Sequence, residues 1–304
     1  MSLSPNAQGA LWMTASMAGF AVEDTFIKSA AGAVPVGQVL ASFGVIGTLI
    51  FAMLCLRRGE RLVHPALFSR PMAARCSFEM LGRVFYTLAI ALTPLSTASA
   101  ILQAAPLVVA LGAMVVLREP VSPARWLAIF VGFAGVLLVL RPGLDGFDTL
   151  AILSVLGMVG FAGRDLATRA APPALSHMQL SLYGCAILIP AGLVILAFEG
   201  APVMPSGPDA LRILAAALAG SAAYFALTNA MRTGDVGVVA PFRYTRLVVA
   251  MGLAALVFGE RPDSATLVGS AIIVAAGLIA LATGRRRRPA VKPAGKISGA
   301  APKD

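Results

Sequence analysis

Two segments of this chain carry the same pattern: MAGFAVEDTFIK at residues 17–28 and MVGFAGRDLATR at residues 158–169. A shift from position 17 to position 158, that is 141 positions, superposes Met, Gly, Phe, Ala and Asp on identical residues. Apolar composition alone does not produce several identities in register at two distant places. The chain is therefore predicted to consist of two homologous halves.

The composition is that of a membrane protein. Of the 304 residues 58% are hydrophobic and 12% are charged, and the mean hydropathy is +0.85. A soluble globular protein does not tolerate so apolar a surface. The 3 cysteines show no CxxC spacing and no histidine partner, which argues against a disulfide framework or a metal site.

Ten segments are long and apolar enough to be membrane-spanning helices, which need about 20 residues each. They are residues 9–28, 36–56, 72–92, 96–117, 123–140, 149–169, 177–198, 209–230, 236–258 and 263–283. Most Lys and Arg outside these segments fall on one side of the membrane, so both termini are predicted to be cytoplasmic and the location to be a bacterial inner membrane.

The predicted fold is an all-α membrane protein with an inverted five-plus-five repeat of helices. Each half, residues 1–141 and 142–284, carries five segments, and an odd number makes the second half enter the membrane from the opposite side. Residues 285–304 are predicted to be a basic, disordered cytoplasmic tail. Its run of four arginines is interpreted as a topology signal rather than a nucleic-acid site.

Charged residues inside the spans are costly, so they are expected to face a cavity or one another. Four acids and four arginines lie well inside, at positions Glu23, Asp24, Glu79, Asp165, Arg83, Arg164, Arg243 and Arg246. Their balance leaves two roles open: ion pairs that hold helices together, or parts of a binding site.

Arginines from both halves suggest an anion-binding site in the middle of the membrane. Glu79, Arg83 and Tyr86 share one helix face, so Glu79 is expected to orient the Arg83 guanidinium within that helix. Arg243 and Arg246 share a face of a second helix at a similar depth. The sequence therefore predicts a site for a carboxylate or phosphate where the two halves meet.

Two prolines interrupt otherwise apolar spans, Pro106 and Pro241. Interrupted helices in matching positions of two halves point to a transport site, although a simple kink remains an equally weighted reading. Possible hydrogen-bonding groups on neighbouring spans are Gln103, Tyr224 and Tyr244.

Glu119 and Glu260 each precede the next predicted helix, in Leu-Arg-Glu-Pro and Gly-Glu-Arg-Pro stretches. A carboxylate near a helix N-terminus is favourable, so both are interpreted as structural caps of that next helix. Enzymatic motifs are missing from the sequence: it contains no GxSxG, no HExxH and no phosphate-binding loop. No enzyme activity, metal or cofactor is expected.

Three features together resemble the EamA-type branch of the drug/metabolite transporter superfamily. They are the duplicated Gly-Phe-Ala-x-x-Asp segment, Leu-Arg-Glu-Pro followed by Gly132-Phe133-Ala134-Gly135-Val136, and Pro241-Phe242-Arg243-Tyr244-Thr245 followed by Phe258-Gly259-Glu260. The resemblance implies ten helices and a central cavity lined by the first, third, fourth, sixth, eighth and ninth of them. All eight intramembrane charges lie on those six helices.

The resemblance implies a secondary transporter of a small organic metabolite, working by alternating access. Because arginines lie beside acids, we expect export of an amino acid or a similar zwitterionic or anionic solute. Uptake of a vitamin-like solute such as riboflavin or S-adenosylmethionine is the alternative, and a non-transporting membrane scaffold is a remote one. Asp24 and Asp165, with Glu23 and Arg164 beside them, are candidates for coupling or gating, or for simple pairing with arginines. The sequence does not indicate an oligomeric state.

Overall fold

The computed structural model describes residues 3–117, 123–141, 148–169, 172, 174–233 and 239–284. The first half of the chain forms α1 (Pro5–Ala31), α2 (Val36–Arg57), the short 3-10 helix η1 (Pro65–Phe68), α3 (Arg70–Leu92), α4 (Leu95–Leu102), α5 (Ala105–Leu117) and α6 (Pro123–Leu140). The second half forms η2 (Thr149–Ala151), α7 (Ile152–Arg169), α8 (His177–Ala186), α9 (Leu188–Glu199), α10 (Gly207–Thr233), η3 (Ala240–Tyr244), α12 (Thr245–Phe258) and α13 (Ser264–Gly284).

The described residues are helical with connecting turns and contain no strand, which confirms the predicted fold class of an all-α membrane protein. Five helical segments among them are long and apolar enough to cross a membrane: Val36–Arg57, Thr149–Thr168, His177–Glu199, Gly207–Leu227 and Pro241–Phe258. Helices α1 and α3 are 27 and 23 residues long and carry the buried charges, which lower their hydropathy. The basic tail, residues 285–304, lies outside the described residues.

The predicted segment 96–117 is two helices rather than one, because α4 ends at Leu102 and α5 begins at Ala105. Pro106 is the second residue of α5, where its missing N–H costs nothing, so it starts a helix instead of kinking one. Pro241 lies in η3, directly before α12. The break between α8 and α9 was not predicted. Pro190 lies in the first turn of α9 there, at a position that a proline tolerates.

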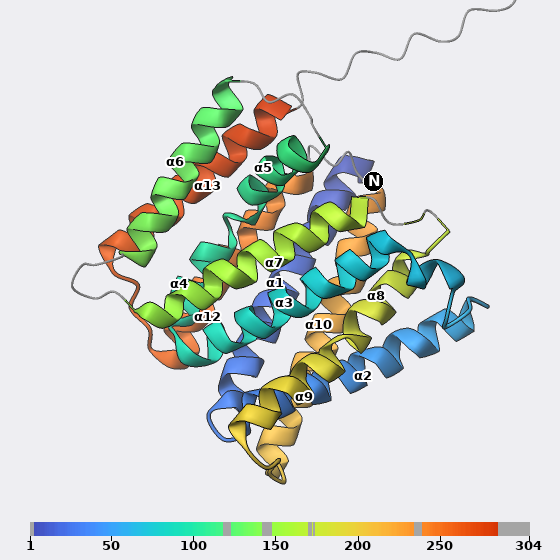
Figure 1. Ribbon diagram of the computed structural model, residues 1–304. Helices are drawn as coiled ribbons and strands as arrows, with labels where there is room; N and C mark the ends of the chain where they lie inside the picture. The colour runs from blue at the N-terminus through green and yellow to red at the C-terminus, as the bar shows by residue number, and fades with distance from the viewer. Residues whose placement is uncertain are drawn as a thin grey trace, which may run out of the picture.

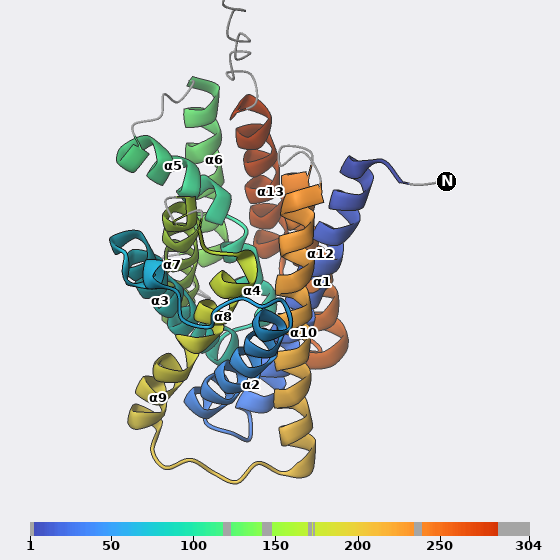
Figure 2. The ribbon, with the colours of Figure 1, turned by 90° about the vertical axis from the view of Figure 1, so that its right-hand side faces the viewer.

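The main helix contacts join one half of the chain to the other (Figures 1 and 2). Helix α1 packs along α10, α3 along α7, and α6 along α13. Helix α2 lies against α8 and α9, and α4 against α12. In Figure 1, α6 and α13 form a pair to one side of the other helices. Because each of these contacts joins a segment of the first half to a segment of the second, the halves share one core instead of forming two separate bundles.

Glycines allow the closest of these contacts. A Cβ placed on Gly37 of α2 would lie 2.5 Å from the Gly192 carbonyl oxygen, and a Cβ placed on Gly192 of α9 would lie 2.5 Å from the Gly37 carbonyl oxygen. Small residues drive helix association in lipid, because lipid tails remove the hydrophobic advantage of burying larger ones. The α2–α9 contact therefore depends on these two glycines.

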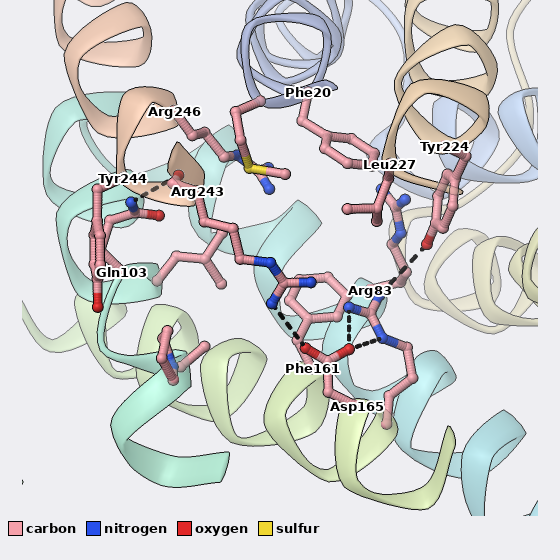
Figure 3. A pocket seen from close by; sticks show the side chains of 15 residues that line it. Phe20, Arg83, Gln103, Phe161, Asp165, Tyr224, Leu227, Arg243, Tyr244 and Arg246 are labelled. Carbon is pink, nitrogen blue, oxygen red and sulfur yellow. Dashed lines mark hydrogen bonds and ion pairs between the residues drawn. The ribbon is translucent and has the colours of Figure 1, made fainter. Parts of the chain in front are cut away.

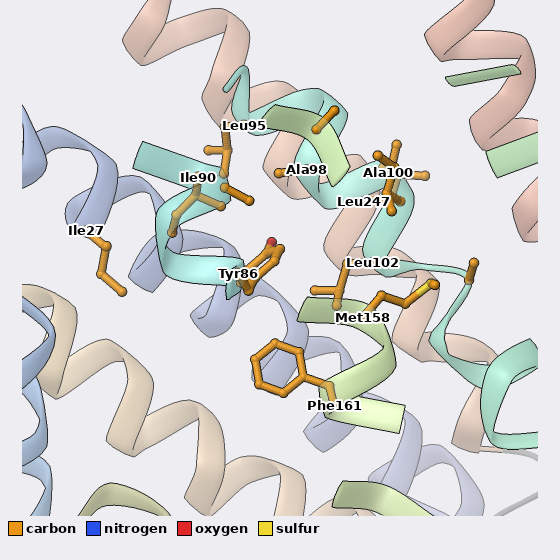
Figure 4. Close-up of a cluster of buried hydrophobic side chains, with 14 of the residues drawn as sticks. Ile27, Tyr86, Ile90, Leu95, Ala98, Ala100, Leu102, Met158, Phe161 and Leu247 are labelled. Atoms are coloured by element: carbon orange, nitrogen blue, oxygen red, sulfur yellow. The ribbon is translucent and has the colours of Figure 1, made fainter. Parts of the chain in front are cut away.

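A large apolar cluster fills the region between α1, α3, α4, α7 and α12 (Figure 4). Tyr86 and Ile90 of α3 meet Leu95 and Ala98 of α4 there, and Leu247 of α12 reaches the same region. Each of these side chains is at most 5% exposed. This cluster closes the space between the five helices on one side of the charged residues.

Two glutamates cap helices of the other half. Helices α2 and α4 begin after prolines, which provide no side-chain cap. The Glu199 carboxylate accepts from the N–H groups of Val36 and Gly37 at 3.0 and 2.7 Å. The Glu260 carboxylate accepts from the N–H groups of Leu95 and Ser96 at 2.8 and 3.0 Å.

Glu260 was therefore predicted correctly as a cap but assigned to the wrong helix. It caps α4 of the first half, whereas Asp263 caps α13, the next helix, by accepting from the Thr266 N–H at 2.9 Å. That hydrogen bond, together with Arg141, holds the pKa of Asp263 below its ordinary range. Glu119 lies outside the described residues.

Replacing Gly192 by Ala should lower the melting temperature of the protein in detergent, because the added methyl group overlaps the α2 backbone. We expect a loss of about 1–3 kcal/mol, as for other overpacked contacts. Tryptophan fluorescence during heating measures it. Gly252→Ala is the control: a Cβ at Gly252 of α12 meets nothing within 4 Å, so this variant should be neutral or slightly more stable. Equal melting of both variants would contradict the assigned contact.

Candidate functional site

One pocket lies among the segments from both halves (Figure 3). Its empty volume is about 730 Å³, including its open side. Its lining comes from α1, α3, the α4–α5 break, α7, α10, η3 and α12. The lining residues are Met17, Phe20, Arg83, Leu102, Gln103, Ala105, Pro106, Phe161, Arg164, Asp165, Tyr224, Leu227, Arg243, Tyr244 and Arg246.

The pocket lies toward one end of the helices that surround it. Asp165 and Leu227 are close to the C-terminal ends of α7 and α10, and Arg243 lies in η3, two residues before α12 begins. Met17 belongs to the N-terminal half of α1. The Lys and Arg distribution predicts that these ends face the cytoplasm.

The two broken segments meet at the pocket wall. Gln103 lies between α4 and α5, and its side-chain amide donates to the Arg243 carbonyl oxygen at 3.3 Å. Arg243 belongs to η3, where the tighter 3-10 winding and Pro241 precede the regular helix α12. Irregular backbone at membrane depth occurs where it lines a cavity. The breaks therefore bring Gln103, Arg243 and Tyr244 to the pocket surface.

All eight buried charges form ion pairs in the structure. Arg83 donates to Glu23 at 2.6 Å, and Arg246 donates to Asp24 at 2.6 Å. Arg164 donates twice to one oxygen of Asp165, at 2.8 and 3.0 Å. Arg243 reaches the other Asp165 oxygen at 3.5 Å. The four acids thus hold four arginines around the pocket.

Arg83 contacts the expected partner, Glu79, but that contact is not its shortest. Its Nε lies 3.7 Å from Glu79 on the same helix, whereas its close partner is Glu23 of α1. Glu79 instead accepts from Arg164 of α7 and from the Tyr224 hydroxyl of α10, both at 3.3 Å. Helix spacing had shown which residues share a face, but it could not show which helix packs against that face.

Arg75 also belongs to this charged layer, although it is not among the eight charges singled out from the sequence. It is buried on α3, where its Nε donates to the Thr168 hydroxyl at 3.2 Å and a terminal nitrogen lies 3.9 Å from Glu79. Its position in register with Glu79 and Arg83 along one helix was the signal that could have revealed it.

The repeat is symmetric in its aspartates but not in their partners. Asp24 and Asp165 occupy equivalent positions, yet both pair with arginines near the start of α12. The shift of 141 positions that superposes the two repeated segments, position 17 on position 158, also superposes Leu102 on Arg243 and Ala105 on Arg246. The first half thus has no arginines at the corresponding positions, and the site is chemically one-sided.

Exposure separates an accessible polar part of the pocket from a buried one. The Arg243 and Asp165 side chains are 33% and 26% exposed, whereas Arg83 is 8% exposed. The Arg243–Asp165 contact, at 3.5 Å, is also the longest of the pairs that the two aspartates form. The groups most accessible to a solute are therefore one guanidinium and one carboxylate oxygen.

Most of the candidates from the sequence line the pocket: Arg83, Gln103, Pro106, Arg164, Asp165, Tyr224, Arg243, Tyr244 and Arg246. Others lie behind the wall and hold it, namely Glu23, Asp24, Glu79 and Tyr86, the last of which donates to Asp24 at 3.2 Å. Pro241 is not part of the lining. The apolar lining residues were missed, although Phe20 and Phe161 belong to the repeated motif itself.

Among the described residues no group of three or more His, Cys, Asp or Glu side chains is arranged to hold a metal ion. The acidic side chain in the pocket lining, Asp165, contacts the arginines Arg164 and Arg243.

Comparison with known protein families matches this chain twice to the model of the EamA-like transporter family, over residues 7–141 and 149–282. The chain belongs to the EamA-like transporter family. Both halves found in the sequence are therefore family repeats, and the family places the protein among drug/metabolite transporters of the membrane rather than among enzymes.

Several characterised relatives are similar over most of this chain. A riboflavin transporter of Rhizobium johnstonii is 28% identical over 92% of each chain. An S-adenosylmethionine uptake transporter of Rickettsia felis is 27% identical over 65% of this chain and 66% of its own length. The pseudopaline exporter CntI of Pseudomonas aeruginosa is 27% identical over 84% of this chain and 90% of its own length.

A solved protein structure has the same fold, with a TM-score of 0.60 and 19% identity, over 92% of this chain and 98% of that one. The relatives' names differ in solute and direction, so they leave the transported molecule of this protein open.

Replacing Arg83 by Met should destabilise the protein strongly, because it leaves the buried Glu23 carboxylate without its close partner. Breaking a buried pair from one side costs about 3–5 kcal/mol, and adding Glu23→Gln should recover part of the loss. Arg212→Met is the control, because Arg212 is 44% exposed in its pair with Asp209 and should contribute less than about 1 kcal/mol. The melting temperature in detergent measures the stability of Arg83→Met, of the double variant with Glu23→Gln, and of Arg212→Met. Equal losses at Arg83 and Arg212 would refute the buried pair.

Proposed function

We propose that this family member is a secondary transporter of the bacterial inner membrane, with ten spans in an inverted five-plus-five arrangement. The odd number of spans in each half supports the inversion, and the extensive contacts between helices of the two halves support a shared central pathway. No phosphate-binding loop accompanies the helices. The solute binds in the pocket and crosses by alternating access.

The proposed solute is a small zwitterion such as an amino acid. The observation that carries this proposal is the loose Arg243–Asp165 pair, at 3.5 Å, which faces the pocket. Arg164 holds only one oxygen of Asp165 closely, so the second oxygen can accept from an ammonium group. The planar Arg243 guanidinium matches a carboxylate. A zwitterion that enters between the two replaces one long ion pair with two short ones.

Aromatic rings surround this polar pair and give the solute an apolar contact. Phe20, Phe161 and Tyr224 line the pocket. The Arg164 and Arg246 guanidinium groups lie 4.9 and 5.3 Å from the centres of the Phe161 and Phe20 rings, which fixes those rings in place. A solute with an apolar or flat side chain is therefore favoured.

Export is the proposed direction. The pocket lies toward the ends of α7, α10 and α12 that the charge distribution assigns to the cytoplasm. A solute produced inside the cell reaches it there. Because a secondary transporter follows the gradients of its solutes, an assay from both sides determines the direction directly.

Proteoliposomes that contain Arg243→Ala should transport labelled amino acids with a kcat/KM about 30-fold or more below the parent protein. A charge-assisted pair that loses one partner costs about 2 kcal/mol or more. Amino acid amides, which lack the carboxylate, should be affected far less. Phe242→Ala is the matched control, because Phe242 is the adjacent residue and does not line the pocket.

This experiment has two contrary outcomes. If no amino acid in the panel is transported or exchanged by the parent protein, the solute class is wrong. If Arg243→Ala lowers transport of acids and amides equally, Arg243 is not the carboxylate site.

Uptake of a vitamin-like ring compound is the second candidate. It is favoured by the four aromatic side chains in the pocket wall, Phe20, Phe161, Tyr224 and Tyr244, and by the similarity to riboflavin transporters. In this case ring contacts dominate, since stacking is worth about 1 kcal/mol for each ring pair, and the Arg243–Asp165 pair stays closed.

A riboflavin-requiring bacterial strain at low vitamin concentration distinguishes the two candidates. Uptake predicts that the parent protein restores growth, that Phe20→Leu weakens the rescue because it removes a ring at similar volume, and that Arg243→Ala retains it. Failure of the parent protein to restore growth, at verified expression, rejects the second candidate.

A further inference from the structure

Lys28 binds three other segments at the end of α1. Its ammonium group donates to the carbonyl oxygens of Ile90 and Thr93 at 3.0 and 2.6 Å, where α3 ends. It also lies 3.7 Å from the Glu260 carboxylate and 5.4 Å from the centre of the Phe258 ring. The side chain is 16% exposed, so its charge is balanced mainly by these protein groups.

Glu260 connects the same place to α4. Its carboxylate accepts from the N–H groups of Leu95 and Ser96, and from the Ser96 hydroxyl at 2.8 Å. Lys28 and Glu260 together join the C-terminal end of α1, the Thr93–Pro94 turn between α3 and α4, and the link after α12. We name this set, Lys28, Glu260 and Ser96 with the turn at Thr93, the Lys28 cluster.

The Lys28 cluster lies at the ends of segments whose more central residues line the pocket. Along α1, Lys28 follows Phe20 by eight residues (28 against 20), a distance of about 12 Å at 1.5 Å per residue. Glu260 follows Arg246 of α12 by fourteen residues (260 against 246), about 21 Å if the chain were helical throughout. Ile90 and Leu95, whose backbone groups bind Lys28 and Glu260, belong with Leu247 to the buried apolar cluster (Figure 4).

The contacts of the cluster cross from one half of the chain to the other. Glu260 belongs to the second half, while Lys28, Thr93 and Ser96 belong to the first. If the halves move relative to each other during transport, the bonds to Glu260 must break as a group. In the present conformation they hold together the three segments that end on the side away from the pocket.

We infer that the Lys28 cluster closes the transport pathway on the side of the membrane away from the pocket opening. The cluster opens when the pocket becomes accessible from that side. This inference rests on the proposed transport function. The cluster stabilises the state in which the pocket is open toward the end of the helices where the pocket lies, and closed toward the end that carries Lys28. Weakening it shifts the two-state equilibrium toward the opposite state by the free energy that the lost bonds contributed.

The geometry also excludes rescue by exchanging the two charges. A carboxylate at position 28 would face the carbonyl oxygens of Ile90 and Thr93, and an ammonium group at position 260 would face the N–H groups of Leu95 and Ser96. A simple ion pair tolerates such an exchange, but this cluster does not. Lys28→Arg, which keeps the cation and its donors, is the conservative variant.

A cysteine in the pocket reports which side is open, and it needs no transported solute. Leu227→Cys is placed in protein whose native cysteines, Cys55, Cys76 and Cys185, are replaced by serine or alanine. A membrane-impermeant maleimide is added to right-side-out or inside-out vesicles. Lys28→Met and Glu260→Gln should each raise the labelling rate from the far side about tenfold, the change that a loss of 1.4 kcal/mol produces in a two-state equilibrium.

Arg212→Met is the matched control, because Arg212 lies near the N-terminal end of α10 and its side chain is 44% exposed in its pair with Asp209. It should leave the rate unchanged, as should Lys28→Arg. Ser96→Ala removes a single hydroxyl bond to Glu260 and should raise the rate about threefold. This mild variant decides the matter if Lys28→Met does not fold, which gel filtration in detergent shows.

Three results would overturn the inference. They are an unchanged far-side rate in folded Glu260→Gln and Ser96→Ala, an equal rise in Arg212→Met, and full rescue of Lys28→Glu by Glu260→Lys. Failure of amino acid transport leaves this experiment intact, because the labelling depends only on access to the pocket. The solute class and the closure are therefore tested separately.

Discussion

Ion pairing of buried charges governs the interior of this protein. A charge surrounded by apolar side chains and lipid is costly unless an opposite charge lies beside it. Each of the four acids inside the helices has an arginine in contact, and the closest partner of Glu23, Glu79 or Asp24 comes from a different helix. The pairs therefore fix how α1, α3, α7 and α12 lie against one another. The pocket occupies the place where these pairs converge, and its polarity is a consequence of the way the helices are held together.

Local pattern predicted much of this molecule. The repeated motif identified the halves, the apolar segments correspond to helices, and most of the polar candidates line one pocket. The repeat was readable because identities such as Phe20 and Phe161 persist in register. The polar pocket residues could be predicted because charged and amide side chains are rare in an apolar sequence.

Contacts between distant segments could not be read in the same way. Glu79 and Arg83 have the spacing of an intrahelical pair, yet Glu23 of α1 lies closer to Arg83 than Glu79 does. Glu260 precedes α13 along the chain and caps α4 in space. The choice of partner depends on which helix packs against which face, and small residues such as Gly37 and Gly192 decide that packing without any polar signature. Breaks between helices were equally difficult to predict. Pro106 begins a helix instead of interrupting one, and the break between α8 and α9 was not predicted.

The unequal partners of the two aspartates have a further consequence for an inverted repeat. In such an arrangement the two halves exchange conformations between the states that face each side. With identical halves the two states would be related by a two-fold rotation and would be equal in free energy. Here the second half carries two arginines, Arg243 and Arg246. The first half has Leu102 and Ala105 at the corresponding positions. In the proposed inverted arrangement the two states then differ in free energy even without solute. We therefore expect the empty protein to rest mainly in one orientation and to bind its solute with different apparent affinities from the two sides of the membrane.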